Sequence, residues 1–177
     1  MRITEADAAA IPAITAIYND AVEHTTAIWN DQTVDEANRA AWVAEHEQAG
    51  FPVLVAVDDD EVVGYATFGP WRPHDGYRYT VEHSVYVRSD QRGRGLGRTL
   101  MVELIDRARA LGLHAMVAGI ASDNLGSIRL HEKLGFQTVG MLPQVGTKFG
   151  TWLDLTFLQL TLDDRERPED AERGEKR

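Results

Sequence analysis

The sequence predicts a single α/β domain, and two observations support that prediction. Apolar residues recur every three or four positions in some segments and alternate in others, as in a chain with both helices and strands. The strand-like segments come first as a meander and then alternate with helices in a β-α-β-α-β order. The chain has 177 residues, of which 44% are hydrophobic and 26% charged, so it is long enough to bury one core.

The first half of the chain should form a helical pair followed by a hairpin. The expected elements are a strand at Arg2–Glu5, a helix capped by Asp7 with Ile11, Ile14, Tyr18 and Val22 on one face, a loop over 23–32, a helix from the capping box Thr33–Glu36 to Ala49–Gly50, and the strands Phe51–Val57 and Val62–Phe68. The acidic segment Asp58–Glu61 joins the two strands as a turn.

The second half should alternate strands and helices. The expected elements are a loop at Gly69–Gly76, a strand at Tyr77–Val87, a helix at Leu96–Leu111, a strand at Ala115–Ala121, a helix at Leu125–Leu134 capped by Ser122–Asn124, a short strand after Gly135-Phe136, and a long strand at Thr151–Leu162. Nearly every later residue is charged, so we expect a domain over residues 1–162 and a solvated tail over 163–177.

Composition excludes several classes of function. The net charge of −10 argues against nucleic acid as a partner, because phosphate backbones need a basic face. The chain has no cysteine, so a cysteinyl intermediate, a Cys-ligated zinc and disulfides are absent. The six histidines show no metal-ligand spacing, and we expect no metal. No apolar run is long enough to span a membrane, so we expect a cytoplasmic protein without a membrane partner.

The segment Val85–Arg98 is the most informative part of the chain. A β-branched run leads into a turn with three alternating glycines, Gly93, Gly95 and Gly97, and a helix begins at once. Glycine lets a backbone approach a ligand closely, and the first turn of a helix offers free N–H groups to an anion. A P-loop would need Lys-Ser/Thr after the glycines, and a dinucleotide fingerprint would need a downstream acid; both are missing. An ordinary glycine-rich turn remains the alternative.

Two motifs resemble those of the GNAT superfamily of N-acetyltransferases. Arg92–Gly97 reads R-x-x-G-x-G, and Asn124–Phe136 is similar to N-x-x-A/S-x-x-L-Y-x-K-x-G-F. Within the superfamily the chain resembles the phosphinothricin and methionine sulfone/sulfoximine acetyltransferases. That likeness lies in Trp71–Pro73, Thr80–Val87, Leu130–Glu132, Pro143–Gly146 and Trp152–Leu155. The resemblance implies a GNAT fold, whose mixed sheet is splayed open beside the glycine loop and carries helices on both faces.

The resemblance also implies acetyl-CoA as co-substrate. The strand backbone would bind the pantetheine arm, the loop amides and arginines would bind the pyrophosphate, and a helix start would add a contact. The corresponding residues are Val85, Tyr86, Val87, Gly93, Arg94, Gly95, Leu96, Gly97, Arg98 and Asn124. Asn124 could equally be a plain helix cap.

Acetyl transfer to an amine needs a base, an oxyanion donor and a group that neutralises the thiolate. Glu82 is the candidate base, since burial in an apolar strand would raise its pKa; a surface carboxylate is the alternative. The resemblance makes the N–H near Val85 the oxyanion donor. It places His131 where most relatives have tyrosine, as a thiolate acid or as a packing residue. Strand alternation sends His83 to the face opposite Glu82.

The acceptor site is expected around the loop before the catalytic strand. Arg72 would hold a carboxylate, with Arg78 and Lys148 as rivals, and Trp29, Trp71 and Tyr86 could form an apolar wall. The substrate-binding residues we expect are Arg72, Pro73, His74, Glu82, His83 and Ser84.

The resemblance implies acetyl transfer to the α-amino group of a small amino acid or analogue of the methionine sulfone, methionine sulfoximine or phosphinothricin type. One arginine and one carboxylate base suit that chemistry, and the absence of cysteine favours direct transfer. The resemblance also implies a homodimer with Pro143–Trp152 near the interface or the substrate mouth. The alternatives are an acetyltransferase for peptide N-termini or polyamines, and a non-catalytic coenzyme A sensor.

Overall fold

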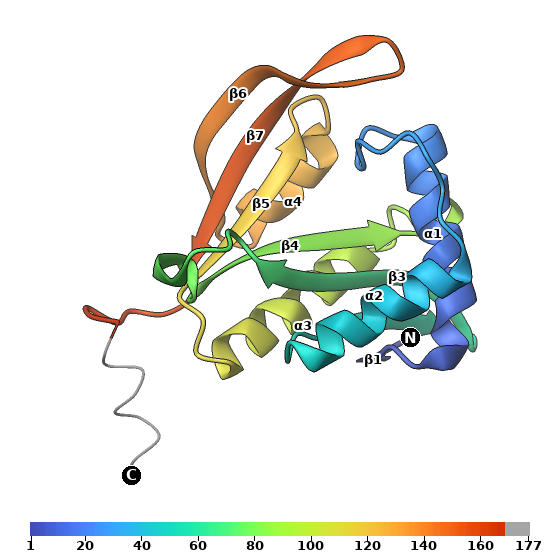
Figure 1. Ribbon diagram of the computed structural model, residues 1–177, viewed down its shortest axis with the longest axis horizontal. Coiled ribbons are helices and arrows are strands. Elements are labelled where there is room, and N and C mark those ends of the chain that lie inside the picture. Colours follow the sequence, from blue (N-terminus) through green and yellow to red (C-terminus); the bar gives the residue numbers. More distant parts are fainter. Residues whose placement is uncertain (169–177) are drawn as a thin grey trace.

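The computed structural model describes residues 1–168, and this part of the chain contains one seven-stranded sheet and four α-helices (Figure 1). The strands are β1 (Arg2–Glu5), β2 (Val53–Asp58), β3 (Glu61–Pro70), β4 (Thr80–Val87), β5 (Ala115–Ala121), β6 (Gln137–Lys148) and β7 (Thr151–Thr161). The helices are α1 (Ile11–His24), α2 (Glu36–Gln48), α3 (Leu96–Ala110) and α4 (Leu125–Lys133), and short 3-10 turns lie at Ala8–Ala10, Asp75–Tyr77 and Ser89–Gln91.

The sheet is mixed, and it divides at one place. Its strand order is β1-β2-β3-β4-β5-β7-β6, and every neighbouring pair is antiparallel except β4 with β5. These two strands pair over three positions, where Thr80–Glu82 lies opposite Ala115–Val117. Beyond Glu82 the strands diverge, so β4 and β5 form a V in Figure 1. The predicted mixed, splayed sheet is confirmed.

Helices cover both faces of the sheet, as predicted. Alternate residues of β2, such as Val53 and Val55, pack against α1, while Leu54 and Ala56 pack against α3. We call these the α1 face and the α3 face. On β4, Tyr86 joins the cluster of the α1 face, and Val85 and Val87 join that of the α3 face.

Most predicted elements are present, and several predictions were wrong in detail. Asp7 caps the 3-10 turn Ala8–Ala10 and not α1, and β4 begins at Thr80 and not at Tyr77. The second helix is capped by Asp35, whose Oδ1 accepts a hydrogen bond from Asn38 N at 2.8 Å, and not by Thr33. The strand after Phe136 is not short but twelve residues long. Pro143 suggests a break, yet β6 is an edge strand with irregular register at Thr138/Gly140 and Leu142/Gly146, and such strands accommodate proline.

Contacts with the domain continue past residue 162. His114 Nδ1 lies 2.7 Å from Asp163 Oδ1, and the Arg165 guanidinium donates to the Gly112 carbonyl at 2.9 Å. The predicted tail begins in this segment, and its last nine residues, 169–177, lie outside the described part of the chain. None of the helices described for residues 1–168 has the length and hydrophobicity needed to cross a membrane.

Candidate active site

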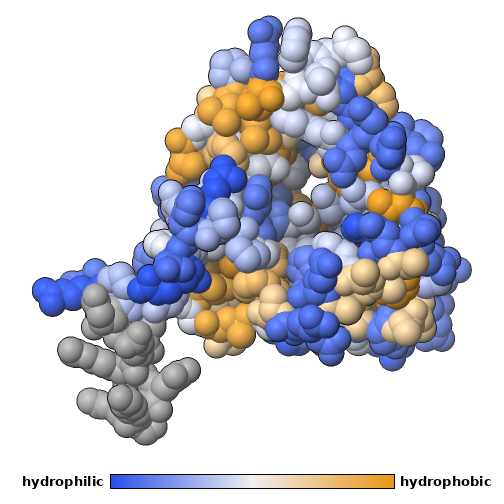
Figure 2. Space-filling model, in the orientation of Figure 1, coloured by the Kyte–Doolittle hydropathy of each residue, from blue (hydrophilic) through white to orange (hydrophobic). Residues whose placement is uncertain are grey.

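A cavity of about 870 Å³ lies where β4 and β5 diverge, and Figure 2 shows the surface hollowed in this region. Its walls come from β4, the glycine loop, the ends of α1 and α4, and the tip of the β6–β7 hairpin. All of the predicted coenzyme residues except Arg94 line it: Val85, Tyr86, Val87, Gly93, Gly95, Leu96, Gly97, Arg98 and Asn124. The coenzyme residues chosen from sequence are thus brought together at one opening.

The glycine loop presents backbone to this cavity. Gly93 and Gly95 have φ values of 80° and 82°, in the left-handed region that favours glycine. Gly95 is the N-cap of α3 and no side chain caps it, so the first-turn N–H groups are available to a ligand. Gly97 has Leu130 and Val87 as its nearest neighbours, which packs the loop between β4 and α4.

The backbone of β4 is a second polar surface in the cavity. One edge of the strand pairs with β3 along Val81–Val87, but the other pairs with β5 over Thr80–Glu82 alone, within residues 1–168. The N–H and C=O groups of residues 83–87 that point toward β5 therefore face the gap. An elongated ligand with an anionic end and amide groups along its length fits a cavity of this kind.

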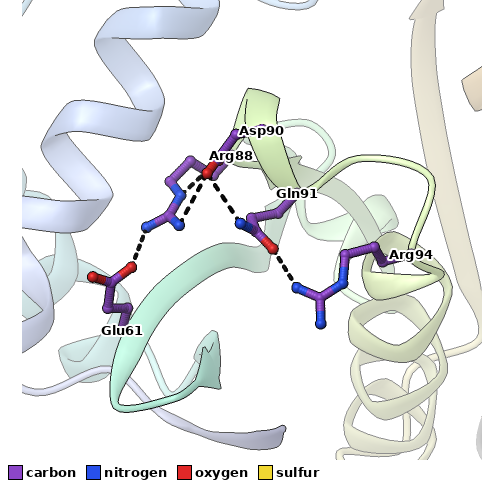
Figure 3. Close-up of polar contacts among 5 residues, drawn as sticks. All are labelled: Glu61, Arg88, Asp90, Gln91 and Arg94. Atoms are coloured by element: carbon purple, nitrogen blue, oxygen red, sulfur yellow. Dashed lines mark hydrogen bonds and ion pairs between the residues drawn. The ribbon is translucent and has the colours of Figure 1, made fainter.

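Acidic partners hold two of the loop arginines, and Figure 3 shows those of Arg88 together with the contact between Arg94 and Gln91. Arg88 donates to Asp90 Oδ1 at 2.7 Å and to Glu61 Oε2 at 2.8 Å. Arg94 donates to Asp58 Oδ2 at 2.8 Å and to Gln91. The Arg94 side chain is thus turned away from the cavity, while Arg92 and Arg98 line it. The side-chain cations next to a bound anion are these two.

Asn124 has the structure of a helix cap and also lines the cavity. Its Oδ1 accepts a hydrogen bond from Ser127 N at 3.1 Å. The cap places the amide group at the cavity wall, so a cap and a coenzyme contact are compatible in this geometry.

Glu82 lies at the root of the V, on the α1 face. Its side chain is half-buried, and a Cβ added to Gly119 of β5 would lie 3.1 Å from its Oε1. Burial raises the pKa of Glu82, and the Arg72 guanidinium opposes that rise. A half-buried carboxylate with a raised pKa is suited to take a proton from an amine.

Arg72 is the cation whose charge lowers the pKa of this carboxylate. Its guanidinium stacks on the Trp71 ring at 4.2 Å, and Trp71 packs edge-on against Phe157 of β7 at 5.4 Å. The rivals are occupied elsewhere: Arg78 donates to the Asp75 carbonyl, and Lys148 donates to the Ile28 carbonyl. Pro73 and His74 are exposed, and the His74 ring lies 6.4 Å from that of Tyr77.

His83 and His131 form a buried stacked pair on the α3 face, with ring centroids 4.9 Å apart. His131 Nδ1 lies 2.7 Å from the Ser127 carbonyl, so it carries the proton, and its Nε2 accepts from His83 Nε2 at 3.1 Å. His83 Nδ1 is buried without a partner. The His83 ring therefore lies on the face of β4 opposite Glu82, and its predicted contact with substrate stays a prediction. A proton-donating role for His131 does not fit this geometry. Its Nδ1 proton is bonded to the Ser127 carbonyl, and its Nε2 is an acceptor for His83.

Sequence reasoning missed the residues of β5 and β7 next to Glu82. A Cβ placed on Gly119 would lie 3.1 Å from Glu82 Oε1, 3.5 Å from a Phe157 ring carbon and 3.7 Å from a Leu155 methyl carbon, so these side chains gather around Gly119. A glycine in the small-residue strand Ala115–Ala121 is the available signal, since glycine in a strand marks a close approach. Among residues 1–168, no three His, Asp or Glu side chains gather in a way that could hold a metal ion.

A mixed sheet that opens around a cavity, with an uncapped helix start and a glycine loop at its rim, defines an acetyl-CoA-dependent N-acetyltransferase. Residues 14–136 match the acetyltransferase (GNAT) family, and the chain belongs to that family.

Named relatives agree with this assignment. An L-methionine sulfoximine/L-methionine sulfone acetyltransferase of Salmonella typhimurium is 58% identical over 96% of this chain and 99% of its own. A phosphinothricin N-acetyltransferase of Alcaligenes faecalis is 40% identical over 86% and 78%. The structure of a putative acetyltransferase from Salmonella typhimurium with its cofactor acetyl-CoA superposes with a TM-score of 0.93, at 58% identity, over 95% of this chain and 97% of that chain.

The histidine pair makes stability sensitive to acid. Burial and the neighbouring His131 lower the pKa of His83 to about 3, and burial lowers that of His131. Below about pH 6.5 these two histidines bind protons in the unfolded chain but not in the folded chain. The free energy of unfolding is therefore highest above about pH 6.5 and falls below it. Between about pH 6.5 and pH 3 the loss is on the order of 1 kcal/mol per pH unit for His83, and His131 adds to it. Urea unfolding at a series of pH values should show this slope, and His83→Leu should flatten it.

His24→Gln is the matched control, because His24 is an exposed histidine on α1 and its removal should leave the slope unchanged. Equal slopes for the parent and His83→Leu would contradict the prediction.

Proposed function

We propose that this enzyme transfers the acetyl group of acetyl-CoA to the α-amino group of a small amino acid or amino-acid analogue in the cytoplasm. The observation that carries the proposal is the half-buried Glu82 carboxylate at the last paired position of β4 and β5, with Arg72 as the cation that lowers its pKa. An α-amino acid offers the complementary pair of charges. The relatives named for methionine sulfone, methionine sulfoximine and phosphinothricin support the same class of acceptor.

Acetyl-CoA would bind along the gap between β4 and β5. The amides from Gly93 to Arg98 would hold its pyrophosphate, with charge from Arg92 and Arg98, and Asn124 would contact it from the α4 cap. The free backbone edge at Val85, Tyr86 and Val87 would hold its amide-bearing arm. When bound, the coenzyme supplies an acetyl thioester. The Arg94 side chain would act indirectly, by fixing the loop to Asp58.

Glu82 would take the proton from the acceptor ammonium, directly or through water, and Arg72 would hold the acceptor carboxylate. Glu82 lies on β4 and Arg72 lies in the loop that precedes β4, so the two side chains would approach the acceptor from one side. Trp71 and Phe157 would bound the acceptor side chain, and Ser84 lies on the same face of β4.

The histidine pair would position β4 instead of carrying protons. The hydrogen bond between His131 and His83 joins α4, which bears Asn124 at its start, to the strand that bears Glu82. A shift of either would move the coenzyme relative to the base.

We also propose a homodimer that uses the β6–β7 hairpin. Large apolar side chains are exposed there, including Val139 at 60%, Met141 at 56% and Trp152 at 66%, and Figure 2 shows hydrophobic residues gathered in that region. The outer edge of β6 has no strand partner within residues 1–168. A free edge with exposed apolar groups favours association with a second copy.

Glu82→Gln tests the mechanism. With a panel of amines, the parent should consume acetyl-CoA with methionine sulfone and similar amino acids, and Glu82→Gln should lower kcat by about 100-fold or more with the Kd for coenzyme A unchanged. Glu132→Gln, which removes an exposed carboxylate on α4, is the control and should retain full activity. Turnover with a peptide or spermidine but not with amino acids would overturn the acceptor assignment. Coenzyme binding without turnover of any amine would favour a sensor.

Arg72→Gln tests the carboxylate contact. Loss of a charge-assisted hydrogen bond should raise the KM for the amino acid at least about 10-fold, with the KM for acetyl-CoA unchanged. The Arg72 cation holds down the pKa of Glu82, so its removal raises that pKa and moves the acidic limb of kcat/KM to higher pH. Arg78→Gln in the same loop should change neither quantity. An acidic limb at the same pH as in the parent would show that Arg72 does not affect the pKa of the catalytic base.

The dimer is tested by mass. Light scattering should give twice the 19.7 kDa of the chain, and Met141→Lys should give the monomer. Val102→Lys, at an exposed apolar position on α3, is the control and should leave the dimer intact. A monomeric parent at the same concentration would refute the proposal.

A further inference from the structure

We propose that Lys148 is a positioning residue that clasps the β6–β7 hairpin to the loop between α1 and α2. The clasp would fix Trp29 at the far end of the space beside Glu82 in which the acceptor would bind, which we call the acceptor chamber. The clasp consists of Gly146–Gly150 on the hairpin and Thr26–Trp29 on the loop. The inference rests on the proposed amino-acid activity, because it concerns which acceptors fit.

The clasp and Glu82 lie on the same face of the sheet. Directly opposed residues of antiparallel strands share a face, and every second residue along a strand returns to it. Gly119, which meets Glu82, is opposed by Phe157; two and four residues back along β7 are Leu155 and Leu153, and Leu153 is opposed by Gly146. The α1 face therefore runs without interruption from Glu82 to Gly146.

Trp29 is interlocked with Gly146. A Cβ at Gly146 would lie 2.2 Å from two carbons of the Trp29 ring, so the indole lies directly on the glycine backbone. The indole is also fixed at its other side, because its Nε1 donates to the Thr26 carbonyl at 2.8 Å. A side chain larger than hydrogen at position 146 must displace the ring.

Lys148 holds the loop in that place. It lies on the same face as Gly146, two residues along, and its side chain is 3% exposed. Its ammonium donates to the Ile28 carbonyl, next to Trp29, and Asp31 is the acidic group whose field reaches it. Burying an ammonium is costly, and a methylene chain of the same length would pack without that cost. A buried cation aimed at one carbonyl indicates that the loop has to be held.

The turn after Lys148 is strained, which is a second and independent observation. Phe149 has a φ of 52°, in the left-handed region that is unfavourable for an aromatic residue, and Gly150 follows with 72°. Strain of this kind is retained where surrounding structure requires it. Phe149 lines the cavity, and nearby Thr26 Oγ1 donates to Asp123 Oδ1 at 3.3 Å, so the loop is tied to the other half of the sheet as well.

The clasp gives the acceptor chamber a fixed length. Four residues of strand separate Phe157 from Leu153, which is about 13 Å along β7 between the positions that oppose Gly119 and Gly146. Side chains at both ends shorten that space to the size of an amino acid with a short side chain. Releasing Trp29 should therefore admit longer acceptors and hold short ones less well.

The test compares Gly146→Ala and Lys148→Met, which release Trp29 in different ways, with Gly140→Ala. Gly140 is on the same strand with open space around its α-carbon, so its variant should behave as the parent. The acceptors are methionine sulfone and straight-chain L-amino acids from 2-aminobutyrate to 2-aminooctanoate. In both releasing variants, the ratio of kcat/KM for 2-aminooctanoate to that for methionine sulfone should rise at least about 10-fold. Coenzyme A affinity and oligomeric state should stay as in the parent.

An unchanged length ratio in an active variant would overturn the clasp, whereas a parent that acetylates no amino acid would overturn the proposed function. Should both releasing variants fail to fold, Trp29→Leu decides, because it removes the half-buried ring and leaves Lys148 and the hairpin intact. A raised ratio in Trp29→Leu supports the wall, and the parent's ratio refutes it.

Discussion

The site depends on how few residues pair β4 with β5. Three opposed positions hold the two halves of the sheet together, and beyond them the strands separate. That separation leaves one backbone edge of β4 without a partner and opens a cavity at the start of α3 and α4. A longer ladder would satisfy those peptide groups and close the cavity. The glycine loop, the Asn124 cap and Glu82 serve a ligand because the pairing stops where it does.

Ion pairs with acidic side chains determine which of the loop arginines face the cavity. Asp58, Glu61 and Asp90 occupy the guanidinium groups of Arg88 and Arg94, although the glycine loop looks uniformly basic in the sequence. Arg92 and Arg98 remain at the cavity wall. At the other end, Arg72 moderates the effect of burial on Glu82. An acidic protein can thus bind a polyanion at one place without a generally basic surface.

Much of this could be predicted from the sequence, because the informative signals are local. The glycine loop, the Asn124 cap and the alternation that separates Glu82 from His83 depend on neighbours in the chain. The length of β6 and the role of Gly119 do not, because bulges and a facing carboxylate come from distant segments. The partners of Arg94, His131 and Lys148 were missed for the same reason: each bonds across 36 to 120 residues, and spacing carries no record of such contacts.

The free edge of β4 has a consequence for how such an enzyme can change over time. The coenzyme surface there consists of peptide groups, which every non-proline residue carries, so most substitutions along the strand leave it in place. The acceptor surface that we propose consists of individual side chains, such as Arg72 and Trp29, and single substitutions would alter it. Such an architecture lets the preference for an amine drift by small steps while the acetyl donor stays the same.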